Sequence, residues 1–155
     1  MGIRLWHHFC WFCLAVLTAA AAASIMQTQF NLAALTELGL AIAWQDWLAT
    51  TWFDLTSFGP VVAGLFAGLL AITLTLGHWV QRWLIGRWHL SRPLWLMLSS
   101  AIGCWVMLWL INSVAPMPTL IAATRSGLGV LTFMLCAALG AWVYSREQTG
   151  GEAHE

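Results

Sequence analysis

Lysine is absent from this sequence, and only 8% of its residues carry a charge. A soluble domain of ordinary composition has roughly a quarter charged residues. The six basic residues are scattered arginines, balanced by six acids, so no concentrated basic face is present to attract a nucleic acid. These shortages exclude a nucleic-acid partner and argue against a water-soluble fold.

Cysteine is also scarce, and the four cysteines all lie inside apolar stretches. A secreted disulfide scaffold would place them in the polar loops of a short chain. Cys10 and Cys13 have the C-x-x-C spacing, but a redox pair needs an exposed and activated thiolate, so we interpret both as structural. Cys104 and Cys136 are interpreted as small packing residues.

Apolar residues, in contrast, make up 61% of the 155 residues. A soluble chain of this size would leave roughly a third of its unfolded surface in contact with water. The lipid bilayer is the solvent that removes this conflict. The length fits one domain, which we assign to residues 1–155.

Four apolar stretches approach or exceed the roughly 20 residues that cross about 30 Å of hydrocarbon as a helix. The sequence therefore predicts an all-α membrane protein, a bundle of four transmembrane helices. The predicted spans are residues 5–26, 60–80, 94–114 and 120–144. The fourth span begins somewhere between Pro118 and Gly127, because proline suits the first position of a helix.

The arginines predict the orientation, since short loops rich in arginine stay in the cytoplasm. Five of the six fall in the terminal tails or in the loop after the second span: Arg4, Arg82, Arg87, Arg92 and Arg146. We expect the inner membrane of a bacterium, with both termini in the cytoplasm. In a competing interpretation, residues 1–23 are a cleaved secretory signal, which leaves the next loop outside as before.

The outer segment 27–59 is poor in glycine, proline and serine, so it is predicted to be folded. Asn31 is expected to cap a short helix that Gly39 ends. A second helix is predicted over residues 42–58, and it should lie along the membrane boundary as a periplasmic lid on the bundle. Its expected stripes are Trp44, Trp47, Leu48, Thr51 and Leu55 on an apolar face and Asp46, Thr50 and Asp54 on an acidic face.

Pairs of small residues four positions apart predict where the helices approach one another in lipid. We expect them to pack within the bundle, with an interface between copies of the chain as the alternative. The pairs are Gly64 with Gly68, Ser99 with Gly103, and Cys136 with Gly140.

Tryptophan and arginine alternate in the loop between the second and third spans. Indole rings anchor at the membrane boundary, and guanidinium groups meet anionic lipid phosphates. We interpret the loop as a lipid anchor, with a surface for a protein partner as the alternative. The anchoring residues are Arg82, Arg87, Arg92, Trp79, Trp83 and Trp88.

Arg125 stands apart from the other arginines, because it falls on the outer side. In a helix that starts at Pro118 it would lie about 10 Å along the span, and an unpaired arginine at depth costs at least about 2.5–3.5 kcal/mol. We predict an ion pair with Asp54 first, and otherwise with Asp46 or Glu37. The pair would clamp the lid to the bundle or bind an anionic ligand.

His8 and His78 are predicted to lie at similar depth on neighbouring helices, which is the minimum geometry for haem or metal ligation. The signal is weak, because no second histidine pair supports it, and we expect no metal and no cofactor.

No catalytic constellation is evident, so we expect a non-catalytic membrane protein, an accessory or binding subunit that uses its lid and the Arg125 region. Its partners would be the bilayer and a membrane protein or a second copy. The alternatives are a small oligomeric channel or transporter, and a haem- or metal-binding redox subunit.

Overall fold

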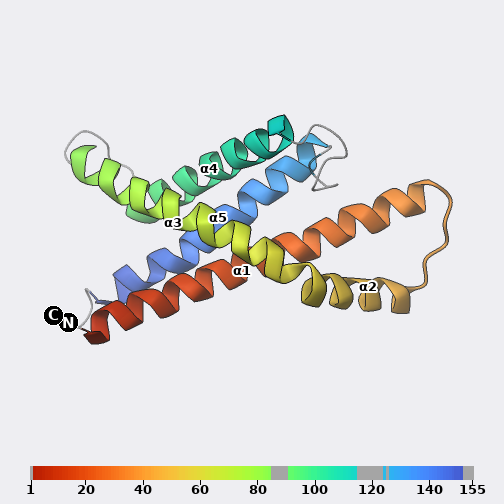
Figure 1. The fold of residues 1–155 in the computed structure, drawn as a ribbon, viewed down its shortest axis with the longest axis horizontal. Helices are drawn as coiled ribbons and strands as arrows, with labels where there is room; N and C mark the ends of the chain where they lie inside the picture. Colours follow the sequence, from red (N-terminus) through yellow and green to blue (C-terminus); the bar gives the residue numbers. More distant parts are fainter. Residues whose placement is uncertain (1, 85–90, 115–123, 125, 152–155) are drawn as a thin grey trace.

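The computed structural model describes residues 2–84, 91–114, 124 and 126–151. Over these ranges the chain forms α-helices and no β-strand (Figure 1). The helices are α1 (Gly2–Glu37), α2 (Trp44–Ser57), α3 (Gly59–Leu84), α4 (Arg92–Val114) and α5 (Gly127–Gly151).

Helices α1, α3, α4 and α5 are each long and apolar enough to cross a membrane. This confirms the all-helical prediction with four candidate spans and gives a multi-pass membrane architecture. Helices α3 and α4 contain the predicted spans 60–80 and 94–114.

The fourth span corresponds to α5, which begins at Gly127, the later limit of the predicted start. The Ser126 side chain explains this start: its Oγ accepts a hydrogen bond from the Gly129 backbone N–H at 3.0 Å. Serine satisfies an N–H group of the first turn that has no partner in the helix. Pro118, the other proposed start, lies outside the described residues.

Helix α1 is longer than predicted, and the separate short helix capped by Asn31 is wrong. The helix passes through Asn31 without a break and ends at Glu37, because the segment has no glycine or proline to interrupt it. Gly39 ends the helix as predicted, with a φ of 87°. Hydrogen bonds from Gly39 N–H to Thr36 O (3.0 Å) and from Leu40 N–H to Leu35 O (3.3 Å) form a Schellman motif.

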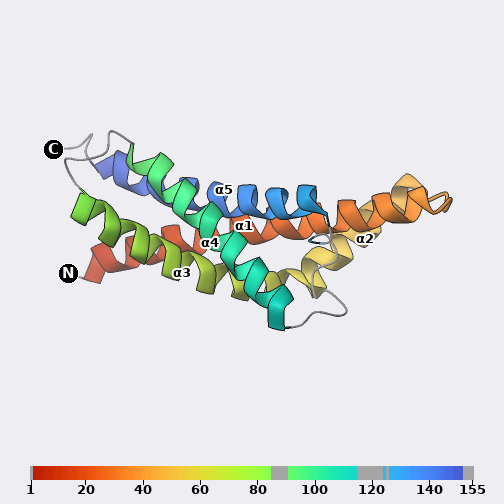
Figure 2. The ribbon, with the colours of Figure 1, turned by 90° about the horizontal axis from the view of Figure 1, so that it is seen from above.

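The 36 residues of α1 span about 54 Å, well beyond the roughly 30 Å of a bilayer core. Helix α2 turns back along α1 and packs against α1 and α3. The α1–α2 hairpin (residues 27–57) therefore projects past the ends of α4 and α5 (Figures 1 and 2). A lid lying over the whole bundle stays a prediction.

The core lies where α1, α3, α4 and α5 meet. Helix α5 packs along both α1 and α4, so α1 begins and α5 ends at the same end of the bundle (Figure 2). Helix α3 ends and α4 begins at that end too (Figure 1). Phe66 and Phe133 stack in the centre with ring centroids 6.5 Å apart. The alanines that line the buried side of α1 are Ala15, Ala19, Ala20 and Ala23.

The predicted small-residue pairs have different surroundings. A Cβ atom added to Gly140 would lie 2.9 Å from Ala15 O and 2.9 Å from Ala19 Cβ, so this glycine permits the close α1–α5 contact. Gly103 similarly faces Thr73 of α3. Gly64 and Gly68 would meet nothing within 4 Å. Packing inside the bundle therefore explains Gly140 and Gly103 but not Gly64 and Gly68.

We expect Gly140→Ala to destabilise the bundle by about 1–3 kcal/mol, because the new methyl group would force α1 and α5 apart. Unfolding in mixed micelles with increasing SDS, followed by circular dichroism, measures this change. Gly64→Ala is the matched control and should be neutral or slightly stabilising, since the site is open and alanine favours helix. Equal effects of the two substitutions would contradict this view of α1–α5 packing.

Candidate functional site

At the projecting end, a hydrogen bond between side chains joins α2 to α1. Thr28 Oγ1 of α1 donates to Asp54 Oδ2 of α2 at 2.8 Å, and Thr28 is almost fully buried. One position further along α1, Gln29 Nε2 donates to Thr51 Oγ1 at 3.3 Å. Asp54 and Thr51 thus face α1, and the two bonds fix the side of α2 that lies against the bundle.

The predicted ion pair cannot be placed on this geometry, because Arg125 lies outside the described residues. The depth assigned to Arg125 from a helix starting at Pro118 does not apply to α5, which begins at Gly127. Asp54 is partly buried, while Asp46 and Glu37 are exposed. Within the described ranges, none of these three acids forms an ion pair. The pairing with Arg125 stays a prediction.

We expect Thr28→Val to raise the hydrogen-exchange rate of α2 about fivefold, because it leaves the Asp54 carboxylate without its donor. Exchange of the peptide that covers α2, read by mass spectrometry, measures this change. The control is Thr18→Val, since the Thr18 hydroxyl bonds only to Leu14 O in its own helix. Unchanged exchange in the Thr28 variant would show that the bond does not hold the hairpin.

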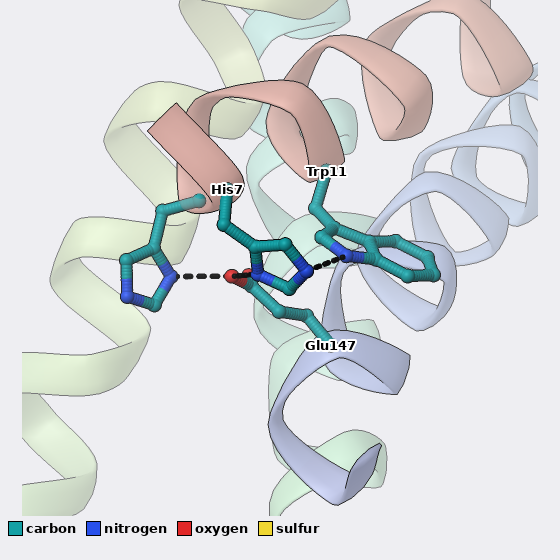
Figure 3. Close-up of polar contacts among 4 residues, drawn as sticks. His7, Trp11 and Glu147 are labelled. Carbon is teal, nitrogen blue, oxygen red and sulfur yellow. Dashed lines mark hydrogen bonds and ion pairs between the residues drawn. The ribbon is translucent and has the colours of Figure 1, made fainter. Parts of the chain in front are cut away.

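At the opposite end, a buried carboxylate of α5 contacts two histidines of α1 (Figure 3). Glu147 Oε1 lies 3.0 Å from His7 Nδ1 and 2.6 Å from His8 Nδ1. The Glu147 side chain is only 3% exposed, whereas those of His7 and His8 are 63% and 54% exposed. Its second oxygen, Oε2, is buried without a hydrogen-bond partner. The cluster joins the start of α1 to the end of α5.

A tryptophan of α1 also contacts this cluster. Trp11 Nε1–H, which can only donate, donates to His7 Nε2 at 3.3 Å. His7 Nδ1 faces Glu147 Oε1, so the His7 ring lies between Trp11 and the carboxylate. His8 Nδ1 is the second ring nitrogen on the same carboxylate oxygen.

The sequence analysis missed Glu147 because it ended the fourth span at residue 144. A signal for it exists in the helical period. Glu147 follows Gly140 by seven positions and Tyr144 by three, which places it on the face of α5 that meets α1. His8 precedes Ala15, a contact of Gly140, by seven positions on α1. In two antiparallel helices these offsets bring His8 and Glu147 together.

The structure does not combine His8 and His78 as a ligand pair. His8 Nδ1 contacts Glu147, while His78 Nδ1 donates to Leu74 O at 2.7 Å. The His78 ring also contacts Tyr144 edge-on, at 6.2 Å between centroids. Among the described residues, no three or more His, Cys, Asp or Glu side chains are grouped to hold a metal ion.

The predicted anchoring residues lie mainly at the end of the bundle where the chain termini meet. Trp79, Trp83, Arg82 and Arg92 are exposed there. Arg87 and Trp88 lie outside the described residues. A further arginine at this end, Arg146, stacks over the Trp142 ring at 4.3 Å. Lipid anchoring by these groups stays a prediction.

No protein-family model matches this sequence, and comparisons with curated proteins and with solved structures find no significant match.

We expect removal of the two histidines to lower the stability of the protein more than removal of the Glu147 carboxylate. The double variant His7→Ala/His8→Ala should cost about 1–3 kcal/mol, because a buried carboxylate is left with no partner. Glu147→Gln should cost less, since it removes the buried charge and the exposed histidines are solvated by water. Unfolding in SDS-containing mixed micelles at neutral pH measures both.

The triple variant that combines all three substitutions is the control. It should be more stable than the double variant, because no carboxylate remains to be buried. If the double variant is as stable as the original chain, the cluster does not stabilise the contact between α1 and α5.

Proposed function

We propose that this chain is a non-catalytic accessory or binding protein of a bacterial inner membrane, and that its projecting α1–α2 hairpin contacts a membrane-protein partner. The observation that carries the proposal is the apolar tip of that hairpin. No residue of α2 is buried, although the helix is rich in aromatic side chains.

The exposed side chains gather on one face of α2 and on the turn before it. Trp44, Leu48 and Trp52 follow one another at four-residue intervals, which places them on one side of the helix. Their exposed fractions are 68%, 61% and 68%, and Leu38 in the turn is 79% exposed. Exposed apolar surface that is contiguous and held in place is typical of a binding surface.

The length of α1 argues that a protein rather than lipid covers the tip. Glu37 lies about 17 Å beyond Met26, the end of the first span predicted from the sequence. Trp52 and Phe53 are close in sequence to Asp54, which bonds to Thr28. Trp44 and Leu48 lie further out, because α2 runs from the tip back toward the bundle (Figure 1). With the first span ending near Met26 as predicted, these two side chains would lie beyond the hydrocarbon of the bilayer.

The hairpin is also held in shape before any partner arrives. The Thr28–Asp54 and Gln29–Thr51 hydrogen bonds fix α2 on α1, and the Schellman motif at Gly39 fixes the turn. A surface that is already ordered loses little entropy on binding. A flexible linker would not have these contacts.

The proposed orientation follows from the charges at the two ends. Arg82, Arg92 and Arg146 lie at the end where α1 begins and α5 ends, whereas the acids Glu37 and Asp46 lie on the hairpin. By the positive-inside rule, the first end is cytoplasmic and the hairpin is periplasmic.

A photoreactive amino acid placed at Trp44 or Leu48 tests the proposal in the cells that produce the protein. We expect crosslinked species of defined mass above the 17.1 kDa of the chain. The control position is Trp105, which is exposed on α4 within a candidate span. It should give mainly lipid adducts.

The mass of the adduct identifies the partner class, and a species of twice the chain mass would indicate a second copy. Adducts to lipid alone from both hairpin positions would overturn the proposal, because they would place the tip inside the bilayer. Thr28→Val should weaken the protein adducts, since it loosens the hairpin.

A further inference from the structure

The second feature that can bind a ligand is a basic recess between α3 and α4, at the opposite end of the bundle from the hairpin. It has a volume of about 270 Å³ and is lined by His78, Gln81, Arg82 and Arg92. Three of these residues come from α3, and Arg92 is the first residue of α4. No carboxylate is among the lining side chains.

Close helix packing just below the recess brings its two arginines together. A Cβ atom at Gly77 would lie 3.0 Å from Ser99 Oγ and 3.1 Å from Leu96 Cδ2, so the glycine lets α4 approach α3 closely. Trp95 Nε1–H then donates to Gly77 O at 3.0 Å. Arg92 precedes Trp95 by one helical turn, and this bond fixes the start of α4 beside α3.

The lining residues of α3 share one face. His78, Gln81 and Arg82 are spaced by three and four positions, whereas Trp79 and Trp83 form a separate pair four apart. The His78 ring contacts Tyr144 of α5, so the recess face begins against the bundle at His78 and continues through the half-buried Gln81 to the exposed Arg82. Trp79 and Trp83 are exposed. The recess is therefore distinct from the tryptophan anchor on the same helix.

The charges of the recess are not balanced by a described acid. Neither Arg82 nor Arg92 forms an ion pair within the described ranges. Glu147, an acid described at this end, contacts His7 and His8 through Oε1. Two guanidinium groups that face one cavity repel each other. An anion between them attracts both groups, so the net electrostatic interaction becomes favourable. Arginine forks match the oxygens of phosphate in bidentate pairs.

We propose that this recess binds a phosphate group, with Arg82 and Arg92 as paired donors and Gln81 as a neutral one. The recess lies where two candidate spans meet the aqueous boundary, because one ends at Trp83 and the next begins at Arg92. A phosphate at this level belongs to a lipid headgroup or to a soluble phosphate ester from the same side. Basic recesses between helices at this boundary bind anionic headgroups.

The lipid source is tested by native mass spectrometry of the full chain in detergent, titrated with dioleoylphosphatidylglycerol. The soluble source is tested by calorimetric titration with glycerol 3-phosphate and with inorganic phosphate. Arg82→Gln and Arg92→Gln should each weaken binding of the responding probe about fivefold to tenfold. Arg92→Lys should recover part of the loss, because it restores the charge without the planar fork.

Arg146→Gln is the matched control, because Arg146 lies at the same end and stacks on Trp142 outside the recess. It should change binding less than twofold. A response to one probe class identifies the source and supports the site. Equal losses in the Arg82, Arg92 and Arg146 variants would overturn the proposal in favour of diffuse charge attraction. Absence of binding by all three probes would overturn it as well.

The experiments on the phosphate site and on the hairpin test two independent proposals. Crosslinking from the hairpin does not depend on Arg82 or Arg92, and phosphate binding does not depend on Thr28.

Discussion

The close contact between α1 and α5 is the constraint on which the rest of the structure depends. Gly140 lets the Ala15 carbonyl and the Ala19 side chain come within van der Waals distance of the α5 backbone. Lipid tails are as apolar as these side chains, so helices associate in a bilayer through close packing rather than through the hydrophobic effect. The contact makes α1 and α5 antiparallel neighbours and brings the start of one beside the end of the other. The His7–His8–Glu147 cluster exists because of that placement.

The same constraint gives the two ends of the molecule different characters. Helix α1 is much longer than its partner, so after meeting α5 along its first part it continues alone past the bundle. Among the described residues, α2 covers it there; no residue of α2 is buried, and two hydrogen bonds between side chains join α2 to α1. At the other end, four helices meet. A polar side chain buried there has neighbouring helices whose side chains can form hydrogen bonds with it. A recess lined by arginines forms at that end, whereas the hairpin presents exposed apolar side chains.

Hydropathy predicted the four apolar helices, because the cost of burying a polar backbone in lipid leaves few alternatives to long helices. It did not predict where α1 ends, since no sequence rule distinguishes a helix that leaves the membrane from one that stops at its surface. Only Gly39, which needs a positive φ, marked that end correctly. Glu147 was missed for a related reason. A single charge near a helix end looks like the start of a solvated tail, and only the pairing of α1 with α5 shows that it is buried.

The His7–His8–Glu147 cluster and the basic recess both lie at the end of the bundle where α1 begins and α5 ends, and their charges are related. A buried glutamate is commonly paired with arginine, because arginine gives the stronger charge-assisted bond. Here two imidazoles on α1 contact Glu147 Oε1, and Trp11 donates to one of them. The partners of Oε1 thus come from α1, while Oε2 is buried without a hydrogen-bond partner. Arg82 and Arg92 are left on the side of α3 and α4 without a described carboxylate, and Arg146 lies on its own tryptophan. Among the described residues, Glu147 is thus engaged by histidines of α1 and is not among the side chains that line the recess proposed for an external anion.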